Sequence, residues 1–363
     1  MSDNGRTAAF HQLLLRTDSR LPDELVAEAR RWLADGMLLD IAQAVVFTAM
    51  TSRIALSEVD VALLAETLAE AGADIDLLAD IEVVTAEEMP LYGLAPVGPE
   101  VLAEHGELIP YNVDLTRTDA GPAGPDGVDA AITDAVSAMT GPAALWRCWR
   151  YPAMDTQWPP AKRMYLVHAD HAVAEADLPD LAARLQNVLL AAGEADPLVT
   201  VFGDADTLPM FQRTALGFAA LLWTARAQPE IRIARSYDPA QAPHGDDTRL
   251  PDDGERERML GYLDQGVPLV ITTTMLDDLV DPARGAAVPT NFRTDGTWVW
   301  SDAVRYYLDQ HRLAPDHDFL AHVRARGYAV PEIDVVSLHR ALAAVQRVPV
   351  TEFDGDPLPA ASG

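Results

Sequence analysis

Between residues 163 and 235 the apolar residues switch repeatedly between the period of a strand and the period of a helix. A strand alternates its side chains every two residues, whereas a helix returns to the same face about every 3.6 residues. The pattern predicts strands and helices in turn, at 163–169, 177–189, 197–202, 208–222 and 230–235. Such alternation is typical of helices packed on a sheet, with parallel pairing as the default. We therefore expect an α/β unit over residues 129–235.

The residues before this unit read as helices. Residues 1–115 contain apolar residues at helical spacing, interrupted by Gly36 and Gly72 at positions where helices commonly end. Ser57 precedes one of these runs and is a good helix-capping residue. We expect a helical N-terminal segment.

The residues after the α/β unit mix both patterns. Residues 255–346 predict a small C-terminal α+β module. Stretches rich in Gly, Pro and Asp at 116–127 and 236–254 read as linkers, and residues 347–363 as a flexible tail. The predicted fold class is α/β in the mixed α+β sense: a helical segment, a central α/β unit and a C-terminal module.

The charge balance limits the partners. Acidic residues outnumber basic ones by 56 to 27, which gives a formal net charge of −29. Proteins that bind nucleic-acid backbones gain affinity from Lys and Arg that neutralise phosphates, so this balance argues against a nucleic-acid partner. An acidic surface instead steers basic proteins toward itself. The charge is uneven, because residues 129–236 hold 12 acidic and 9 basic residues, whereas residues 1–128 hold 23 and 7.

Single residues argue against several common chemistries. Lys162 is the only lysine, and its surroundings lack the Gly-Lys-Ser/Thr of a phosphate-binding P-loop. Cys148 is the only cysteine, which excludes an internal disulfide and a multi-cysteine metal site. The sequence also lacks a Gly-x-Ser-x-Gly nucleophile motif and a Gly-x-Gly-x-x-Gly motif after a strand. We expect no cofactor, no metal and no familiar catalytic centre.

The expected location is the cytoplasm. Met1–Arg6 shows no basic start followed by an apolar stretch, so we expect no signal peptide. The longest apolar runs, such as Thr214–Trp223, are shorter than the roughly 18 residues that span a bilayer. A single cysteine also fits a reducing compartment.

Aromatic and basic side chains are interleaved between Trp146 and Arg163. Three interpretations stay open: core packing, a protein interface rich in Trp and Arg, or a site for an anionic ligand. Cys148 lies inside this stretch without a neighbouring histidine, which predicts a buried structural thiol. The interaction candidates in this stretch are Trp146, Arg147, Trp149, Arg150, Trp158 and Arg163.

Other polar clusters have a structural and a functional interpretation. His168, Asp170 and His171 could hold a metal, but a loop with hydrogen-bonded histidines is favoured. Asp204 and Asp206 follow a strand, where α/β proteins bind ligands, but capping of the next helix is favoured. The acidic run at Asp277, Asp278 and Asp281 reads as a solvated turn rather than a cation site.

The segment Phe292–Tyr328 carries the motif Thr-Asp-Gly-x-Trp-x-Trp followed by Tyr-Tyr-Leu. Asp295 and Gly296 predict a turn into a strand that places Trp298 and Trp300 on one face, where Tyr307 and Leu308 of the next helix can pack. The segment resembles a module of uncharacterised actinobacterial proteins, several of which are similar to immunity proteins of bacterial toxin systems. That resemblance implies a protein-binding role, with Trp298 and Trp300 as further interaction candidates.

Two functions from different classes remain. The first is a cytoplasmic protein-interaction protein, such as an immunity or adaptor protein of a bacterial toxin or conflict system, with an acidic surface and no catalytic residue. The alternative is an enzyme of unknown reaction on the central α/β unit that acts on a small molecule through Asp204, Asp206 or His168. The sequence leaves the oligomeric state open.

Overall fold

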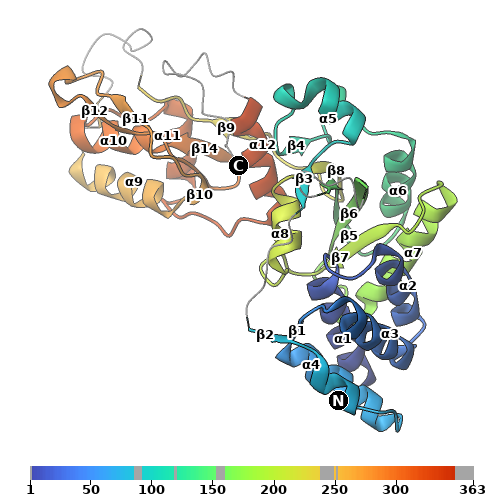
Figure 1. The fold of residues 1–363 in the computed structure, drawn as a ribbon. Coiled ribbons are helices and arrows are strands. Elements are labelled where there is room, and N and C mark those ends of the chain that lie inside the picture. Colours follow the sequence, from blue (N-terminus) through green and yellow to red (C-terminus); the bar gives the residue numbers. More distant parts are fainter. Residues whose placement is uncertain are drawn as a thin grey trace. The chain divides into compact units, whose positions relative to one another are not determined.

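The computed structural model of the chain forms two compact units, Met1–Ala227 and Gln228–Gly363. The predicted mixed α/β class is confirmed, because each unit combines a sheet with helices (Figure 1). The residues that the structure describes are 2–85, 92–117, 121–152, 160–237, 249–250 and 252–347. Trp158, most of the second predicted linker and the predicted tail from residue 348 onward lie outside these ranges.

Consecutive helices fill the N-terminal part of the first unit around one apolar core. Ser57 caps the last of them as predicted, since its hydroxyl accepts a hydrogen bond from Asp60 N at 3.2 Å. Gly36 and Gly72 follow two of the helices with φ values of +72° and +68°, which favour glycine. The bounds are α1 (Asp3–Thr17), α2 (Asp23–Ala34), α3 (Leu38–Ser52) and α4 (Glu58–Glu70).

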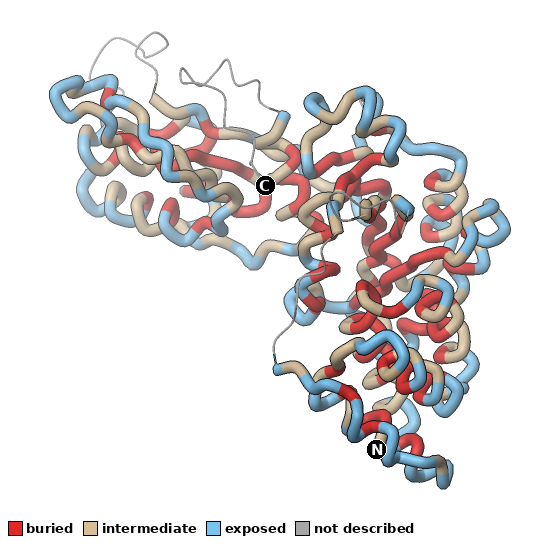
Figure 2. Tube along the Cα trace, in the orientation of Figure 1, coloured by how far each residue is buried: buried red, intermediate tan, exposed pale blue. Residues whose placement is uncertain are grey.

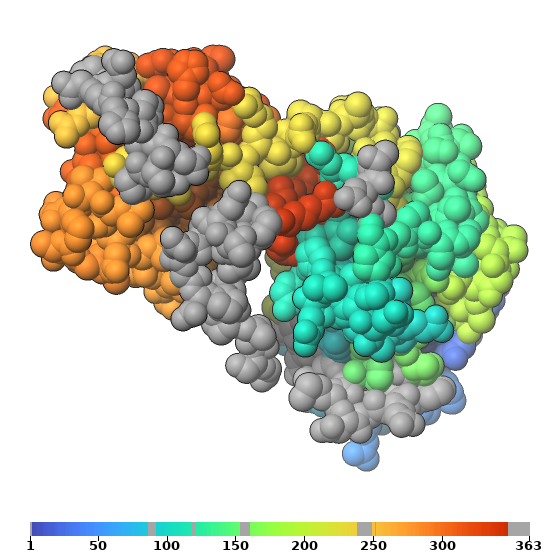
Figure 3. All heavy atoms as spheres, turned by 90° about the horizontal axis from the view of Figure 1, so that it is seen from above, coloured from blue at the N-terminus to red at the C-terminus, as the bar shows by residue number. Residues whose placement is uncertain are grey.

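Short elements lie between and after these helices, and β3 and β4 among them belong to the central sheet. Helix α5 (Pro99–His105) has no buried residue and lies on the surface of the first unit, in teal in Figure 3. The other short elements are β1 (Leu56–Ser57), η1 (Asp76–Asp80), β2 (Val83–Val84), β3 (Gly93–Ala95), η2 (Gly106–Leu108), β4 (Val113–Asp114) and η3 (Gly121–Ala123).

The described residues of the first unit form a central sheet in the order β4-β8-β5-β6-β7, and β3 also pairs with β5. Its longest strands are β5 (Pro142–Tyr151) and β6 (Lys162–Ala169), which run antiparallel to each other. The expected parallel pairing holds for β6 with β7 (Leu198–Phe202), whereas β5 and β8 are antiparallel. The sheet is therefore mixed, and its strands are buried along most of their length (Figure 2).

The helix predicted over residues 208–222 is wrong in its second half. Helix α8 spans Met210–Leu216, and the chain then enters β8 (Ala220–Thr224), which pairs with β5. A continuous apolar run, here Ala219–Trp223, fits a buried strand as well as a buried helix. This run forms a strand because it pairs with the edge of β5. The local sequence does not show that this edge is available.

Helices cover the sheet and its last strand. Helices α6 (Gly127–Ala138) and α7 (Leu178–Ala191) pack with the sheet strands in one apolar core, and η4 (Glu175–Asp177) leads into α7. His11 of α1 donates from Nε2 to the carbonyl oxygen of Val201 on β7 at 3.0 Å. Burial lowers the pKa of His11 to about 4, and the nearby charge of Arg30 acts in the same direction. His11 is therefore neutral at pH 7 and satisfies a backbone acceptor of this strand.

The second unit has its own sheet, in the order β10-β13-β14-β9 among the described residues. The segment 230–235, predicted as a strand of the central unit, forms β9 here and pairs in parallel with β14. A hairpin and several helices complete the unit. The strands are β9 (Arg232–Ile233), β10 (Val267–Val270), β11 (Met275–Asp277), β12 (Ala286–Pro289), β13 (Phe292–Thr294) and β14 (Trp298–Ser301). The helices are α9 (Asp253–Gln265), η6 (Pro282–Arg284), α10 (Asp302–His311), α11 (His317–Ala325) and α12 (Val335–Arg347).

Trp298 and Trp300 lie on the same face of β14, as predicted. Both rings contact Phe319 of α11, with ring centroids 5.2 Å away in each case. Leu308 joins this core, whereas Tyr307 packs in a separate cluster with Val288. The predicted packing of Tyr307 on the two tryptophans is therefore wrong, while that of Leu308 is confirmed.

Gly266, directly after α9, lies against the Trp300 ring and has no room for a side chain. A Cβ at this position would stand 2.7 Å from Trp300 Cη2 and closer still to Cζ2. We predict that Gly266→Ala lowers the free energy of unfolding of the second unit by about 1–3 kcal/mol, because the core must shift. Urea denaturation followed by tryptophan fluorescence measures this effect.

Gly261 provides a matched control within the same helix. A Cβ there meets nothing within 4 Å, so Gly261→Ala should be neutral or stabilising by up to about 1 kcal/mol. Equal effects of the two substitutions would contradict the packing described for Trp300.

Candidate protein-binding groove

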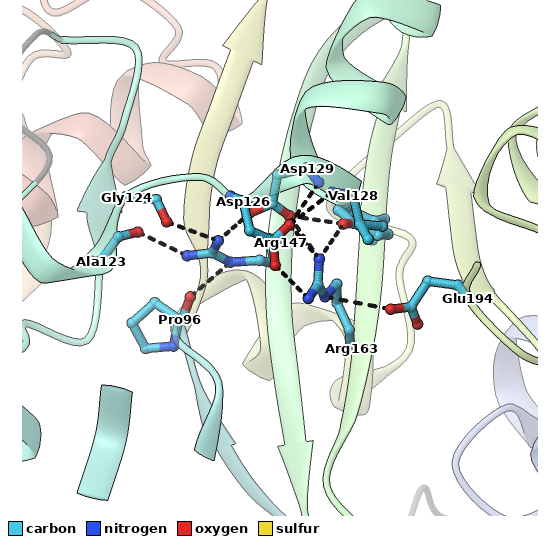
Figure 4. Close-up of polar contacts among 10 residues, drawn as sticks. Pro96, Ala123, Gly124, Asp126, Val128, Asp129, Arg147, Arg163 and Glu194 are labelled. Carbon is cyan, nitrogen blue, oxygen red and sulfur yellow. Dashed lines mark hydrogen bonds and ion pairs between the residues drawn. The ribbon is translucent and has the colours of Figure 1, made fainter. Parts of the chain in front are cut away.

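Arg147 and Arg163, two of the predicted interaction candidates, form an internal polar network in the first unit (Figure 4). Arg147 of β5 pairs with the carboxylate of Asp129 on α6, and its Nε donates to Pro96 O at 3.1 Å. Arg163 of β6 donates to both carboxylate oxygens of Asp126, at 2.8 and 2.6 Å. The two arginines thus hold the start of α6 against the sheet.

The other members of this group are also engaged within the unit. Trp146 is fully buried, and Arg150 is buried in a two-bond ion pair with Asp23 of α2 at 2.9 and 2.7 Å. Trp149 is partly buried under the Arg163 guanidinium, which lies 4.8 Å from the ring centroid. Internal packing therefore accounts for Trp146, Arg147, Arg150 and Arg163, whereas Trp149 stays partly exposed and Trp158 lies outside the described residues.

Cys148 is a buried thiol, as predicted. Burial raises its pKa to about 12, so the thiol stays protonated at neutral pH. A protonated and fully enclosed sulfur is a poor nucleophile, which fits a packing role on β5.

The polar residues considered for metal binding or catalysis make local contacts. His168 Nε2 contacts Gly203 O at 3.1 Å, and the His171 side chain is exposed. Asp204 Oδ1 accepts from Asp206 N at 2.9 Å within a turn. The favoured capping role of Asp204 and Asp206 is wrong, because α8 begins after Pro209 and has no side-chain cap. Within the described residues no group of His, Cys, Asp and Glu side chains is arranged to hold a metal ion.

Asp295 of the Thr-Asp-Gly-x-Trp-x-Trp motif anchors its turn. The buried carboxylate accepts from the backbone N–H groups of Thr297 at 2.8 Å and Trp298 at 2.7 Å. Its other oxygen accepts from the Tyr262 hydroxyl and from His322 Nε2. Burial opposes ionisation, but these donated hydrogen bonds hold the pKa of Asp295 below its ordinary value. The motif is thus a buried anion that fixes the start of β14.

Asp278 repeats the same arrangement in the acidic run that was expected to be solvated. It is buried, and it accepts from the backbone N–H groups of Val280 and Asp281 at 2.9 and 3.0 Å. Its second oxygen accepts from the Tyr306 hydroxyl at 2.9 Å and from His311 Nε2 at 2.7 Å. The solvated-turn prediction is therefore wrong for Asp278, because four donors compensate the loss of water.

A groove of about 460 Å³ lies between β9 and the start of α11 in the second unit. Trp298 forms part of its wall, and among the interaction candidates that the structure describes it alone lines this groove. Arg232 and Ile233 are consecutive on β9, so their side chains point to opposite faces of the sheet. Both of them nevertheless line the groove. The groove therefore follows the edge of the strand rather than one face of the sheet. The remaining lining residues are Glu230, Ile231, Arg235, Asp316, His317 and Asp318.

One backbone N–H group of β9 points away from its neighbour β14. Arg232 N and Ala234 N donate to Thr297 O and Val299 O, at 3.0 and 2.8 Å, which leaves the Ile233 N–H pointing the opposite way. Among the described residues no strand pairs with that second edge, since β9 ends the sheet order. An open strand edge is a template for a further strand.

The charges along the groove are already paired. Arg232 donates to Asp318 at 2.6 Å and lies 4.3 Å from the Trp298 ring centroid. Arg235 donates to Asp316 at 2.9 Å. The Arg232–Asp318 pair is exposed on both sides and Arg235 is exposed, so these pairs fix side-chain directions more than they add stability. The groove offers backbone hydrogen bonds and paired charges rather than an unpaired charge.

Comparison with known proteins assigns no family to this chain. No protein-family model, curated protein or solved structure matches the chain. Within the described residues no helix is both long enough and apolar enough to cross a membrane.

The buried carboxylate of Asp295 makes the second unit sensitive to acid. Its pKa is lowered on folding, so its contribution is fully present above the unfolded pKa of about 3.9 and is lost as the pH falls through the folded value. We predict that Asp295→Asn lowers the free energy of unfolding by about 1–3 kcal/mol at pH 7, because charged hydrogen bonds are lost. The difference from the unmodified chain should shrink below about pH 4.

Urea unfolding at a series of pH values measures this difference. Asp277→Asn is the control, because Asp277 is exposed and its loss should change the free energy by less than about 0.5 kcal/mol. A constant effect of Asp295→Asn from pH 7 to pH 3 would contradict the anchoring role.

Proposed function

We propose that the protein binds other proteins, and that its second unit takes an extended segment of the partner as an added strand beside β9. The observation that carries this proposal is the open edge of β9 along a groove of about 460 Å³. Strand addition draws its affinity from main-chain hydrogen bonds and its specificity from the pockets beside them. The outward N–H of Ile233 supplies such a donor.

The charge of the chain supports a basic partner. The second unit carries 22 acidic and 13 basic residues, and the arginines in the groove already have carboxylate partners. An acidic surface around a groove of paired charges attracts a positively charged protein at long range while the backbone edge provides the contact. We therefore propose that the protein is an immunity or adaptor protein of a bacterial toxin system, which is what the resemblance of Phe292–Tyr328 implies.

The enzyme alternative has less support. Asp204 closes a turn through Asp206 N, and His168 contacts a backbone carbonyl. No described contact joins these side chains into a general acid–base pair. The binding proposal therefore takes precedence.

A proline at position 233 tests strand addition directly. Ile233→Pro removes the outward N–H while leaving the hydrogen bonds of Arg232 N and Ala234 N to β14 in place. We predict that it weakens binding of the captured partner by about tenfold, the loss expected for one or two main-chain hydrogen bonds. The partner is first captured from native lysate by the full chain, and its affinity is then measured by calorimetry.

Ile233→Val is the matched control, because it keeps both the N–H and a β-branched side chain, and its affinity should be unchanged. Equal affinities for the proline and valine variants would contradict strand addition. Recovery of no partner at any salt concentration would count against protein binding itself.

A further inference from the structure

A second pocket, of about 290 Å³, lies in the first unit. The end of α1, the start of α4 and the start of α8 line it, together with Val84 and Thr85. These elements are far apart in the sequence and come together only in the fold. No local sequence motif therefore indicates the pocket. Nothing in the proposed binding of proteins by the second unit uses it.

Part of the lining of this pocket is apolar. Val59, on the first turn of α4, is 69% exposed, and Met210, at the start of α8, is 38% exposed. Phe211 also lines the pocket and is 6% exposed. Exposed apolar side chains that face a common hollow are suited to the hydrocarbon part of a small ligand.

The lining also includes one positive charge without a carboxylate partner among its described contacts. Arg16 is neutralised by Asp60, to which it donates from Nε and Nη2 at 2.6 to 3.2 Å. Arg20 instead donates to two backbone carbonyls, Ala55 O at 2.6 Å and Arg16 O at 3.3 Å. Carbonyl groups orient the guanidinium but do not cancel its charge. A positive charge without a carboxylate partner is unusual in this part of the chain, because residues 1–128 hold only 7 basic residues against 23 acidic ones.

Further hydrogen-bonding groups line the same pocket. Ser19 and Ser57 line it, and the Ser57 hydroxyl is already oriented by donation to Asp60 Oδ2 at 2.6 Å. A carboxylate beside Arg20 would gain a charge-assisted hydrogen bond, and it would lie against Val59 and Met210 with its hydrocarbon part.

We infer that this pocket binds a small amphipathic carboxylate, with the anionic group on Arg20 and the hydrocarbon part on Val59, Met210 and Phe211. The class is set by the Arg20 guanidinium, which has no carboxylate partner among the described residues, and by the apolar side chains that line the same pocket. The volume limits the ligand to a short chain or a single ring.

Octanoate and its neutral analogue octanamide test the inference on the full chain. Isothermal titration calorimetry should give saturable one-to-one binding of octanoate in the millimolar range or tighter, and octanamide should bind at least tenfold more weakly. Raising the salt concentration should weaken octanoate and leave octanamide unchanged.

Substitutions locate the site. Arg20→Gln should weaken octanoate at least tenfold, whereas Arg31→Gln, which removes an equally charged but exposed side chain of α2, should leave it unchanged. Val59 lies on the exposed rim, so its substitutions should not disturb folding. Val59→Lys should bind octanoate about tenfold more tightly than Val59→Glu, because both variants lose the same apolar contact and differ only in the sign of the rim charge.

Three outcomes would overturn the inference. They are an absence of saturable octanoate binding at ten millimolar, equal affinities for octanoate and octanamide, and identical effects of the two Val59 substitutions. Each of these can occur while the second unit still binds a protein, so the two proposals fail separately.

Discussion

A guanidinium leaves water only where acceptors replace it, and this requirement at Arg147 organises the first unit. Arg147 lies on the central strand β5 and is 4% exposed. Its donors reach the carboxylate of Asp129 and the carbonyls of Pro96 and Ala123, which belong to three separate segments. Removing the Asp129 carboxylate would leave a buried charge uncompensated, at a cost of several kcal/mol, whereas losing one carbonyl would leave a single buried donor unsatisfied. One side chain therefore joins α6, the η3 segment and the chain at Pro96 to the sheet.

Much of the fold could be predicted from the sequence, because amphipathic period and helix stops are local properties. Helices α2, α3 and α4, strands β6 and β7, and the paired tryptophans of β14 follow from spacing alone. Strands β8 and β9 could not be assigned in the same way. An apolar run does not say which strand edge it will meet, and β8 and β9 are defined by pairing with β5 and β14.

The candidate sites were harder to predict for a related reason. Arg147 and Arg163 look like interface residues in the sequence, yet Asp129 and Asp126 of a neighbouring helix neutralise them inside the unit. Asp278 looks solvated, yet donors from distant residues bury it. The groove beside β9 and the pocket beside Arg20 are assembled from segments separated by many residues. The local sequence shows which chemical groups are present, but it does not show which residues will surround them in the fold.

An open strand edge that can accept a partner can also accept another copy of the same chain. β9 is only two residues long, and Glu230, Arg232 and Arg235 place charges along it. Short length and charge are the means by which natural sheets discourage pairing between identical edges. The same features make the edge of β9 a poor template for pairing between identical copies of the chain.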